Sequence, residues 1–309
     1  ASHLAVLPAA RSAFSVPIAA VNRFTFDEVA YTFTIEAPPQ RIVVSHLARD
    51  TTRFQQLLDQ AREQRATLAA RAIAEVFPFL PASGFSAMLE RLRERQVVPV
   101  TVLATIDNRV PAALAENVIG ESLRPYYDRL AARMAPDIPC LVFALVPVRE
   151  LERESPAAEP DAEDTGPVDG SEGTDDVESA ETTPLPPKGL APVFSFFFPF
   201  VLPGPRFVVA WETTSASGRA TYFFRTDDED QMSPERAVIK LNDALARVGY
   251  RREPVYLPPN VIERHQRYVH YAIAEKRIPE LVWLRERFIG RAIHSGLETW
   301  SKQVGALLA

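Results

Sequence analysis

The sequence predicts an α+β protein made of two β-hairpin modules, each closed by an amphipathic helix, with a helical block between them and a helical C-terminus. Two stretches rich in aromatic and β-branched residues, 24–45 and 206–225, are each followed by apolar residues at helical spacing. A further apolar stripe at helical spacing begins near residue 281. These patterns assign residues 1–80 to the first module, 81–135 to the helical block, 136–257 to the second module and 258–309 to the C-terminal helices.

The composition is that of a soluble globular protein, with 309 residues of which 47% are hydrophobic and 24% charged. Cys140 is the single cysteine, so an intramolecular disulfide framework is excluded, and one thiolate cannot form a metal site alone. It lies in an apolar run, where we expect an inert core thiol. A single cysteine fits a reducing compartment, and the first eight residues lack the features of a signal peptide. We therefore expect a cytoplasmic protein.

The first module begins with a predicted hairpin. Residues 31–35 alternate apolar and polar side chains, two prolines follow, and residues 41–45 are typical of the returning strand. Asp50 is placed to cap a helix that continues to about Val76, with Phe54 and Leu58 on its inner face. In the helical block that follows, helices are predicted at 86–95, 100–106, 111–119 and 122–134.

An acidic insert interrupts the second module. Residues 150–187 hold 13 acidic residues and one arginine, a charge of −12, whereas the whole chain carries −6. The remaining chain is therefore mildly basic, at +6. A segment this polar buries too little apolar surface to offset the entropy of ordering it, so we expect disorder. Apolar runs at 140–146 and 193–202 flank the insert, which predicts a long hairpin loop inside one sheet and not a linker between domains.

The rest of the second module is a predicted hairpin at 206–213 and 219–225, followed by a helix. Ser233 is placed to cap that helix, Pro234 occupies its first position and Gly249 follows its end. The aromatic-rich residues 190–211 could also form a membrane-dipping loop. Four prolines break any helix there, so buried strands are favoured and a membrane partner is not expected.

The C-terminal region is predicted to hold one helix at 260–276 and a second that starts at Pro279 and continues for more than six turns. The apolar stripe of that second helix must cover the sheet, another domain or a partner. Its members are candidates for a partner-binding surface: Leu281, Phe288, Ile289, Ile293, Leu297 and Trp300.

Basic side chains also gather toward the C-terminus. The candidates for contact with an anionic partner are Arg251, Arg252, Arg264, Arg267, Arg287 and Arg291. Glutamates are interleaved with them, and mixed signs favour an ordinary solvated face over a nucleic-acid surface. The acidic insert could also fold back on these arginines.

A hairpin that leads into a closing helix resembles the C-terminal half of pleckstrin-homology-like domains. Residues 42–50 are also similar to the strand-to-helix join of uncharacterised bacterial proteins that carry such domains. The resemblance covers about a third of the chain. It implies a small bent sheet plugged by a helix. Seven strands do not precede either helix, and the basic motif that grips phosphoinositides is missing, so the resemblance does not imply lipid binding.

The sequence contains no phosphate-binding glycine loop and no nucleophile elbow, and its five histidines form no metal-ligand pair at helical spacing. No cofactor, metal or catalytic residue is therefore predicted. The acidic group at 227–230 is interpreted as a complement to the following helix dipole and not as a metal site. Glu212, at the end of a strand, is expected to face solvent.

These features favour a non-enzymatic cytoplasmic interaction or scaffold protein that holds a protein partner through sheet edges or the C-terminal helix, and they are compatible with a homo-oligomer. One alternative is an enzyme whose site is assembled from scattered residues, with Asp227, Asp228, Glu212 and His46 as candidates. The other is a nucleic-acid or anionic-surface binder that uses the C-terminal arginines.

Overall fold

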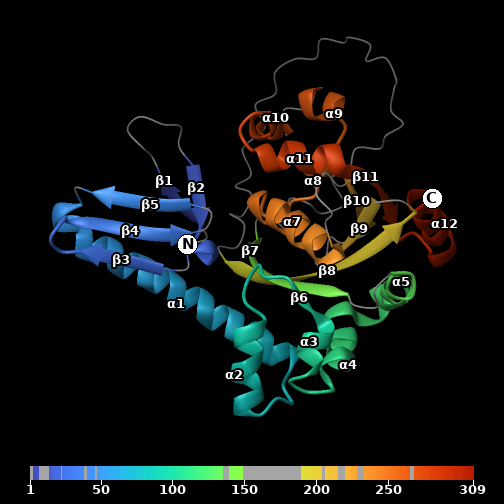
Figure 1. Cartoon of the computed structure of the whole chain (residues 1–309), viewed down its shortest axis with the longest axis horizontal. Coiled ribbons are helices and arrows are strands. Elements are labelled where there is room, and N and C mark those ends of the chain that lie inside the picture. The colour runs from blue at the N-terminus through green and yellow to red at the C-terminus, as the bar shows by residue number, and fades with distance from the viewer. Residues whose placement is uncertain are drawn as a thin grey trace, which may run out of the picture.

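We describe the protein from a computed structural model (Figure 1). It describes residues 3–6, 14–21, 23–37, 40–45, 47–134, 139–148, 189–203, 206–214, 220–227, 233–264 and 268–309. The fold is mixed α+β, as predicted, and the described residues form three antiparallel sheets of two, three and six strands. An N-terminal module holds the two small sheets, and the large sheet forms the centre of the remaining chain, which we call the body.

The N-terminal module contains a three-stranded sheet in the order β3-β4-β5. Its elements are β1 (His3–Val6), β2 (Phe14–Pro17), the 3₁₀ turn η1 (Ile18–Ala20), β3 (Arg23–Asp27), β4 (Thr32–Ala37), β5 (Gln40–Ser45) and the 3₁₀ turn η2 (Ala48–Asp50). The predicted hairpin is confirmed, because Phe33 pairs with Val44 and Ile35 with Ile42. Phe33 and Ile35 are fully buried in the module's core, whereas the alternate side chains form a polar outer face.

Helix α1 (Thr51–Val76) connects the module to the body. Its 26 residues span about 39 Å. Leu58 packs in the core of the N-terminal module, whereas Ile73 and Val76 pack in the core of the body. The helix begins where predicted, but the Asp50 side chain makes no capping hydrogen bond. The 3₁₀ turn η2 immediately before the helix gives Asp50 a helical conformation, unsuited to that role.

The body is built on an antiparallel six-stranded sheet in the order β11-β10-β9-β8-β7-β6. Phe194, Phe196 and Phe198 of β8 face one side, and Val193 and Phe197 face the other. Both faces are covered by helices, so the strands are buried on each side (Figure 1). The strands are β6 (Val98–Pro99), β7 (Cys140–Pro147), β8 (Leu190–Leu202), β9 (Arg206–Thr213), β10 (Ala220–Asp227) and β11 (Phe288–Ile293).

One face of the sheet is covered by the helical block, the end of α1 and the last helix, α12. The predicted helices of this block are observed with small shifts of their ends, and residues on both sides of position 136 share one core. Its elements are α2 (Ala82–Arg91), α3 (Val100–Ala104), α4 (Val110–Leu114), the π-helical turn η3 (Ala115–Ile119) and α5 (Gly120–Ala131).

The other face is covered mainly by α7 (Pro234–Arg247) and α11 (Pro279–Arg287). Helix α7 begins as predicted: Pro234 is its first residue, and Ser233 Oγ accepts a hydrogen bond from Arg236 N at 3.4 Å. Gly249, with a φ of +69°, follows its end. The remaining elements are α8 (Glu253–Tyr256), α9 (Pro259–Arg264), α10 (Val269–Glu275) and α12 (Leu297–Leu307).

The prediction of one long helix from Pro279 is wrong. Helix α11 ends at Arg287, strand β11 follows, and α12 begins at Leu297. The unpaired edge of β10 provides the reason, because its backbone groups need partners and β11 supplies them. Gly290 lies in this strand at a φ of +148°, and a Cβ there would lie 2.6 Å from Leu307 Cδ2. A glycine is therefore required where α12 crosses the strand.

The hairpin predicted around the acidic insert is confirmed. Strands β7 and β8 pair from Cys140 opposite Phe197 to Pro147 opposite Leu190, and Val148 N donates to Gly189 O at 3.2 Å. The insert itself, residues 150–187, lies outside the described residues.

We expect a variant in which a four-residue turn replaces residues 150–187 to fold and to be more stable. The ends of the pairing are already in hydrogen-bonding contact, and the shorter loop lowers the entropic cost of closure by about 2 kcal/mol. Urea unfolding of this variant beside the full chain measures the difference. A variant that is insoluble or less stable would show that the insert contributes to the fold.

Candidate functional site

Two cavities lie next to each other where the N-terminal module meets the body. The first, about 660 Å³, is bounded by η1, residues 94–96, α7 and α11; we call it the α7–α11 cavity. The second, about 720 Å³, is bounded by η1, α1 and residues 89–94; we call it the α1 cavity. Ala19 and Glu94 line both cavities, and together the two form the junction cleft.

A buried ion pair lines this cleft, with Glu94 in the walls of both cavities and Arg65 in that of the α1 cavity. Arg65 of α1 is 5% exposed and its guanidinium binds the carboxylate of Glu94 through two hydrogen bonds, one of them Nε to Oε2 at 3.2 Å. Glu94 Oε1 also accepts from Leu145 N at 3.1 Å, and Arg65 Nη2 donates to Leu145 O at 3.2 Å. Strand β6 pairs only with Cys140 and Leu141 of β7. The ion pair therefore supplies hydrogen-bond partners for the Leu145 backbone groups on the same edge, beyond the end of β6.

The next residue extends this arrangement to α7. Arg95 N donates to Phe143 O at 2.7 Å, and Arg95 O accepts from Asn242 Nδ2 at 2.9 Å. Asn242 in turn accepts from the Tyr250 hydroxyl at 2.9 Å, and burial raises the pKa of that hydroxyl. Arg95 has a φ of +66°, which costs a non-glycine residue about 1–2 kcal/mol. These hydrogen bonds hold the strained residue, and with it the cleft wall, in place.

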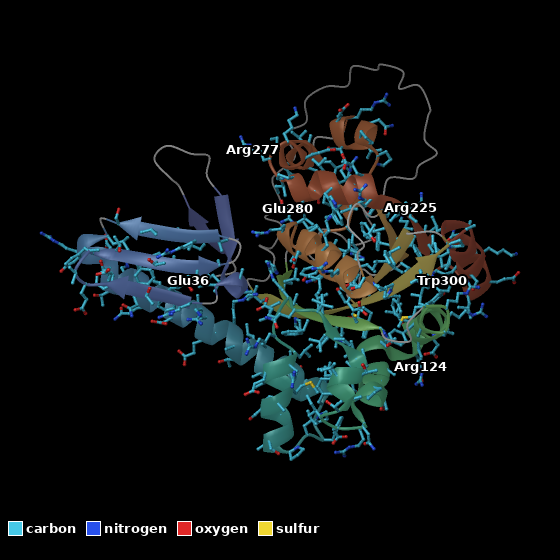
Figure 2. All side chains as sticks on the ribbon, in the orientation of Figure 1. Glu36, Arg124, Arg225, Arg277, Glu280 and Trp300 are labelled. Atoms are coloured by element: carbon cyan, nitrogen blue, oxygen red, sulfur yellow. The ribbon has the colours of Figure 1, made fainter. Side chains whose placement is uncertain are left out.

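Side chains of both charges line the α7–α11 cavity. The positive ones are Arg95, Lys240 and Arg247, and the negative ones are Glu94, Asp243 and Glu280. In Figure 2, Glu280 lies at the end of α11 that faces the N-terminal module. Its Oε1 is 3.9 Å from Arg247 Nε, and Lys240 Nζ lies 5.3 Å from the centre of the Trp283 ring. Desolvation raises the pKa of Asp243, against the opposing charge of Arg247.

A second polar cluster lies inside the body, where β9, β10 and α12 meet. Thr221 Oγ1 lies 2.6 Å from Glu212 Oε2, 3.1 Å from His294 Nε2 and 3.0 Å from Trp300 Nε1. His294 Nε2 is also 3.2 Å from Glu212 Oε2, and the Tyr126 ring packs against the imidazole with centroids 4.3 Å apart and the planes tilted by 31°. The Glu212 and His294 side chains are 3% and 6% exposed. Figure 2 shows Trp300 between the strands and the outer helices.

The donor-only indole of Trp300 constrains the protons of this cluster, because Thr221 Oγ1 must accept its N–H. With Glu212 ionised, the Thr221 hydroxyl donates to the carboxylate and His294 carries its proton on Nε2. Glu212 Oε1 and His294 Nδ1 are buried and have no hydrogen-bond partner among the described residues. A histidine oriented by a carboxylate is a common catalytic arrangement, but these groups are closed off from solvent. In this structure the cluster attaches α12 to the sheet.

The prediction that Glu212 faces solvent is therefore wrong. Because side chains alternate along β9, Glu212 lies on the same face as Val208 and Ala210, and the helical block covers that face. Of the other residues weighed for a scattered catalytic site, Asp227 ends β10, whereas Asp228 and His46 lie outside the described residues. Neither Thr221 nor His294 was predicted as a member of a site. The alternation of residues 220–224 places Thr221 on an inward face, whereas nothing in the sequence signals His294.

The arginines expected to contact an anionic partner do not form one surface. Arg252 is 3% exposed, so its assignment to an exposed patch is wrong. Arg287 and Arg291 lie over aromatic rings, at 6.0 Å from Trp283 and 4.2 Å from Tyr256. Arg251 is half-buried, Arg264 is exposed, and Arg267 lies outside the described residues.

The apolar C-terminal stripe is mostly core. Leu281 and Trp300 are buried, and Phe288, Ile289 and Leu297 pack half-buried against the two faces of the sheet. Ile293 alone in this set is exposed, at 40%. The stripe therefore packs mainly within the chain and does not present a continuous surface to a partner. Cys140 is buried as well, and burial raises its pKa to about 11, which agrees with an inert core thiol.

No protein-family model, curated protein or solved structure significantly matches this chain. Among the described residues, no group of three or more histidine, cysteine or acidic side chains is arranged to hold a metal ion. None of the described helices combines the length and the apolar character needed to cross a bilayer.

We expect Arg65→Met to lower the free energy of unfolding by about 3–5 kcal/mol, because it leaves Glu94 buried without its cation. Arg71→Met is the matched control: Arg71 pairs with Glu75 on the same helix, but its side chain is 78% exposed. Its loss should cost less than about 1 kcal/mol. Urea unfolding compares the two, and equal stability would contradict a structural role for the buried pair.

We expect Thr221→Val to destabilise the protein by about 2 kcal/mol or more, because Trp300 Nε1 and Glu212 lose a shared buried partner. Thr221→Ser keeps the hydroxyl and should retain most of the stability. Chemical unfolding monitored by fluorescence measures both variants. If valine is tolerated as well as serine, the hydroxyl does not organise the cluster.

Proposed function

We propose that this protein is a non-enzymatic interaction protein that binds a segment of a protein partner in the junction cleft. One observation carries the proposal: two cavities of 660 and 720 Å³ adjoin at Ala19 and Glu94. Each lies within the range of about 300–1,000 Å³ that is typical of single ligand sites. Two such cavities in a row suit an extended segment that places one side chain in each.

The walls of the cleft favour a protein segment over a polyanion. Positive and negative side chains occur in equal number around the α7–α11 cavity, whereas a nucleic-acid surface requires an excess of positive charge. Apolar side chains complete the walls, among them Trp283 in one cavity and Ile73, Leu89 and Leu92 in the other. An aromatic anchor surrounded by charged groups is typical of protein–protein contacts.

The edges of the large sheet are less suited to a partner than the cleft. At the β7 edge, Glu94 and Arg65 occupy the Leu145 backbone groups that an added strand would use. At the β11 edge, Ile293 N donates to Gln303 Oε1 at 2.9 Å. Side chains that satisfy edge groups oppose strand addition. The relation to pleckstrin-homology-like domains and the cytoplasmic location stay predictions, and the cleft proposal depends on neither.

A photoreactive amino acid in place of Lys240, at the rim of the cleft, tests the proposal. In cell extract we expect a discrete cross-linked protein from this position and none from the same amino acid at Lys302 on α12, which is 78% exposed and distant in the fold. Ala19→Trp places a large side chain in the wall that both cavities share, and it should abolish the cross-linked product. Leu57→Trp adds the same side chain at an exposed position of α1 and should not. A product that appears equally with Lys302, or that survives Ala19→Trp, would refute the proposal.

A further inference from the structure

The charged groups of the α7–α11 cavity differ in whether they have partners. Each of the cations has one: Arg95 Nη1 donates to Ala246 O at 3.3 Å, Lys240 lies over Trp283, and Arg247 lies beside Glu280. Glu94 is engaged by Arg65. Asp243, by contrast, has no hydrogen bond or ion pair with any described residue. Its carboxylate is the charged group of this cavity without a direct partner, and only the more distant charge of Arg247 acts on it.

Helix geometry places that carboxylate centrally in the wall. The cavity-lining residues Lys240, Asp243, Ala244 and Arg247 occupy positions i, i+3, i+4 and i+7 of α7, which form one face of the helix. Lys240 contacts Trp283 and forms no ion pair with Asp243, and Arg247 likewise stays beyond ion-pair distance from Asp243. Ala19 and Ala20 of η1 line the same cavity with small side chains that leave room for a ligand.

The surroundings of Asp243 favour a positively charged ligand group as the partner of its carboxylate. The cavity walls partly desolvate the carboxylate, and this raises its pKa. A cation brought by a ligand would restore the lost stabilisation through charge-assisted hydrogen bonds. An anion would instead have to displace the existing partners of Arg95, Lys240 or Arg247. The apolar stem of a lysine or arginine side chain is also suited to the two alanines and to the Trp283 ring, where it would take the place of Lys240.

We propose that the partner segment inserts a basic side chain, arginine or lysine, into the α7–α11 cavity, with its charged end at Asp243 and its aliphatic stem along Trp283. This inference rests on the proposed function and adds the chemistry of the partner. It assigns Asp243 as the residue that sets specificity for a positive charge. Glu280 of α11 is a second carboxylate that lines the same cavity.

The experiment is panning of a displayed library of random 12-residue peptides on the full chain. Peptides that bind the wild type but not Ala19→Trp are cleft-directed, and we expect an arginine or lysine in nearly all of them. Asp243→Asn should weaken the binding of these peptides by about 10- to 100-fold, the low end of the effect of removing one partner of an interfacial charge pair, because Asp243 is only partly buried. Lys240→Met removes the neighbouring cation and should tighten binding. Asp128→Asn, on exposed α5, is the matched control and should change nothing.

Tryptophan emission gives an independent measurement of binding in solution. Trp211 and Trp300 are 1% exposed, so Trp283 is the tryptophan that a bound peptide can contact. Emission should therefore change on binding in the wild type and not in Trp283→Phe. Cleft-directed peptides without a basic residue, or with equal affinity for Asp243→Asn, would overturn this inference and leave the proposed function intact. If panning returns no peptide that Ala19→Trp excludes, both proposals fail.

Discussion

The ion pair of Arg65 and Glu94 is the contact on which the arrangement of this molecule depends. It joins three separate parts of the chain: helix α1, the loop before β6, and the backbone of Leu145 in β7. Without it, α1 would be held on the body by apolar packing and by the hydrogen bond that Asn117 Nδ2 donates to Val76 O at 2.9 Å. The N-terminal module packs on α1, and Glu94 lines both cavities, so this pair helps to hold the two sides of the junction cleft in position.

The two buried polar clusters each fix a helix to the large sheet, α1 at β7 and α12 at β10. Charges taken out of water lose solvation energy, and only good hydrogen-bond geometry offsets that loss. At β7 the ion pair also satisfies backbone groups, whereas between β10 and α12 the Thr221 hydroxyl links an acid, an imidazole and an indole. Neither cluster is complete, since Arg65 Nη1 and His294 Nδ1 have no partner among the described residues. With apolar packing alone, α1 and α12 could shift along the sheet. The directional hydrogen bonds of the two clusters oppose such shifts.

The elements that the sequence predicts correctly are those with local signals. Alternation around Phe33, the apolar runs on both sides of the insert, and the Ser233 cap each depend on neighbouring residues, and each is observed. Predictions failed where a distant partner decides. Residues 288–293 keep helical spacing yet pair with β10, whose open edge is a property of the fold and not of that segment. The same holds for the junction cleft, because no pattern in the sequence brings Ala19 close to Trp283.

The hairpin of β7 and β8 has a consequence for the order of folding. Central strand β8 is linked to β9 by a few residues, and β9 to β10 likewise, but more than 40 residues separate Pro147 from Leu190. Pairing of β7 with β8 requires closure of this long loop, which has an entropic cost. The meander of β8, β9 and β10 forms instead from contacts between residues close in sequence. We therefore expect β8, β9 and β10 to form the folding nucleus and β7 to join it later. In pulsed hydrogen exchange, the β7 amides should become protected later than those of β8, β9 and β10. The large sheet would then form from its β8–β10 part toward β7.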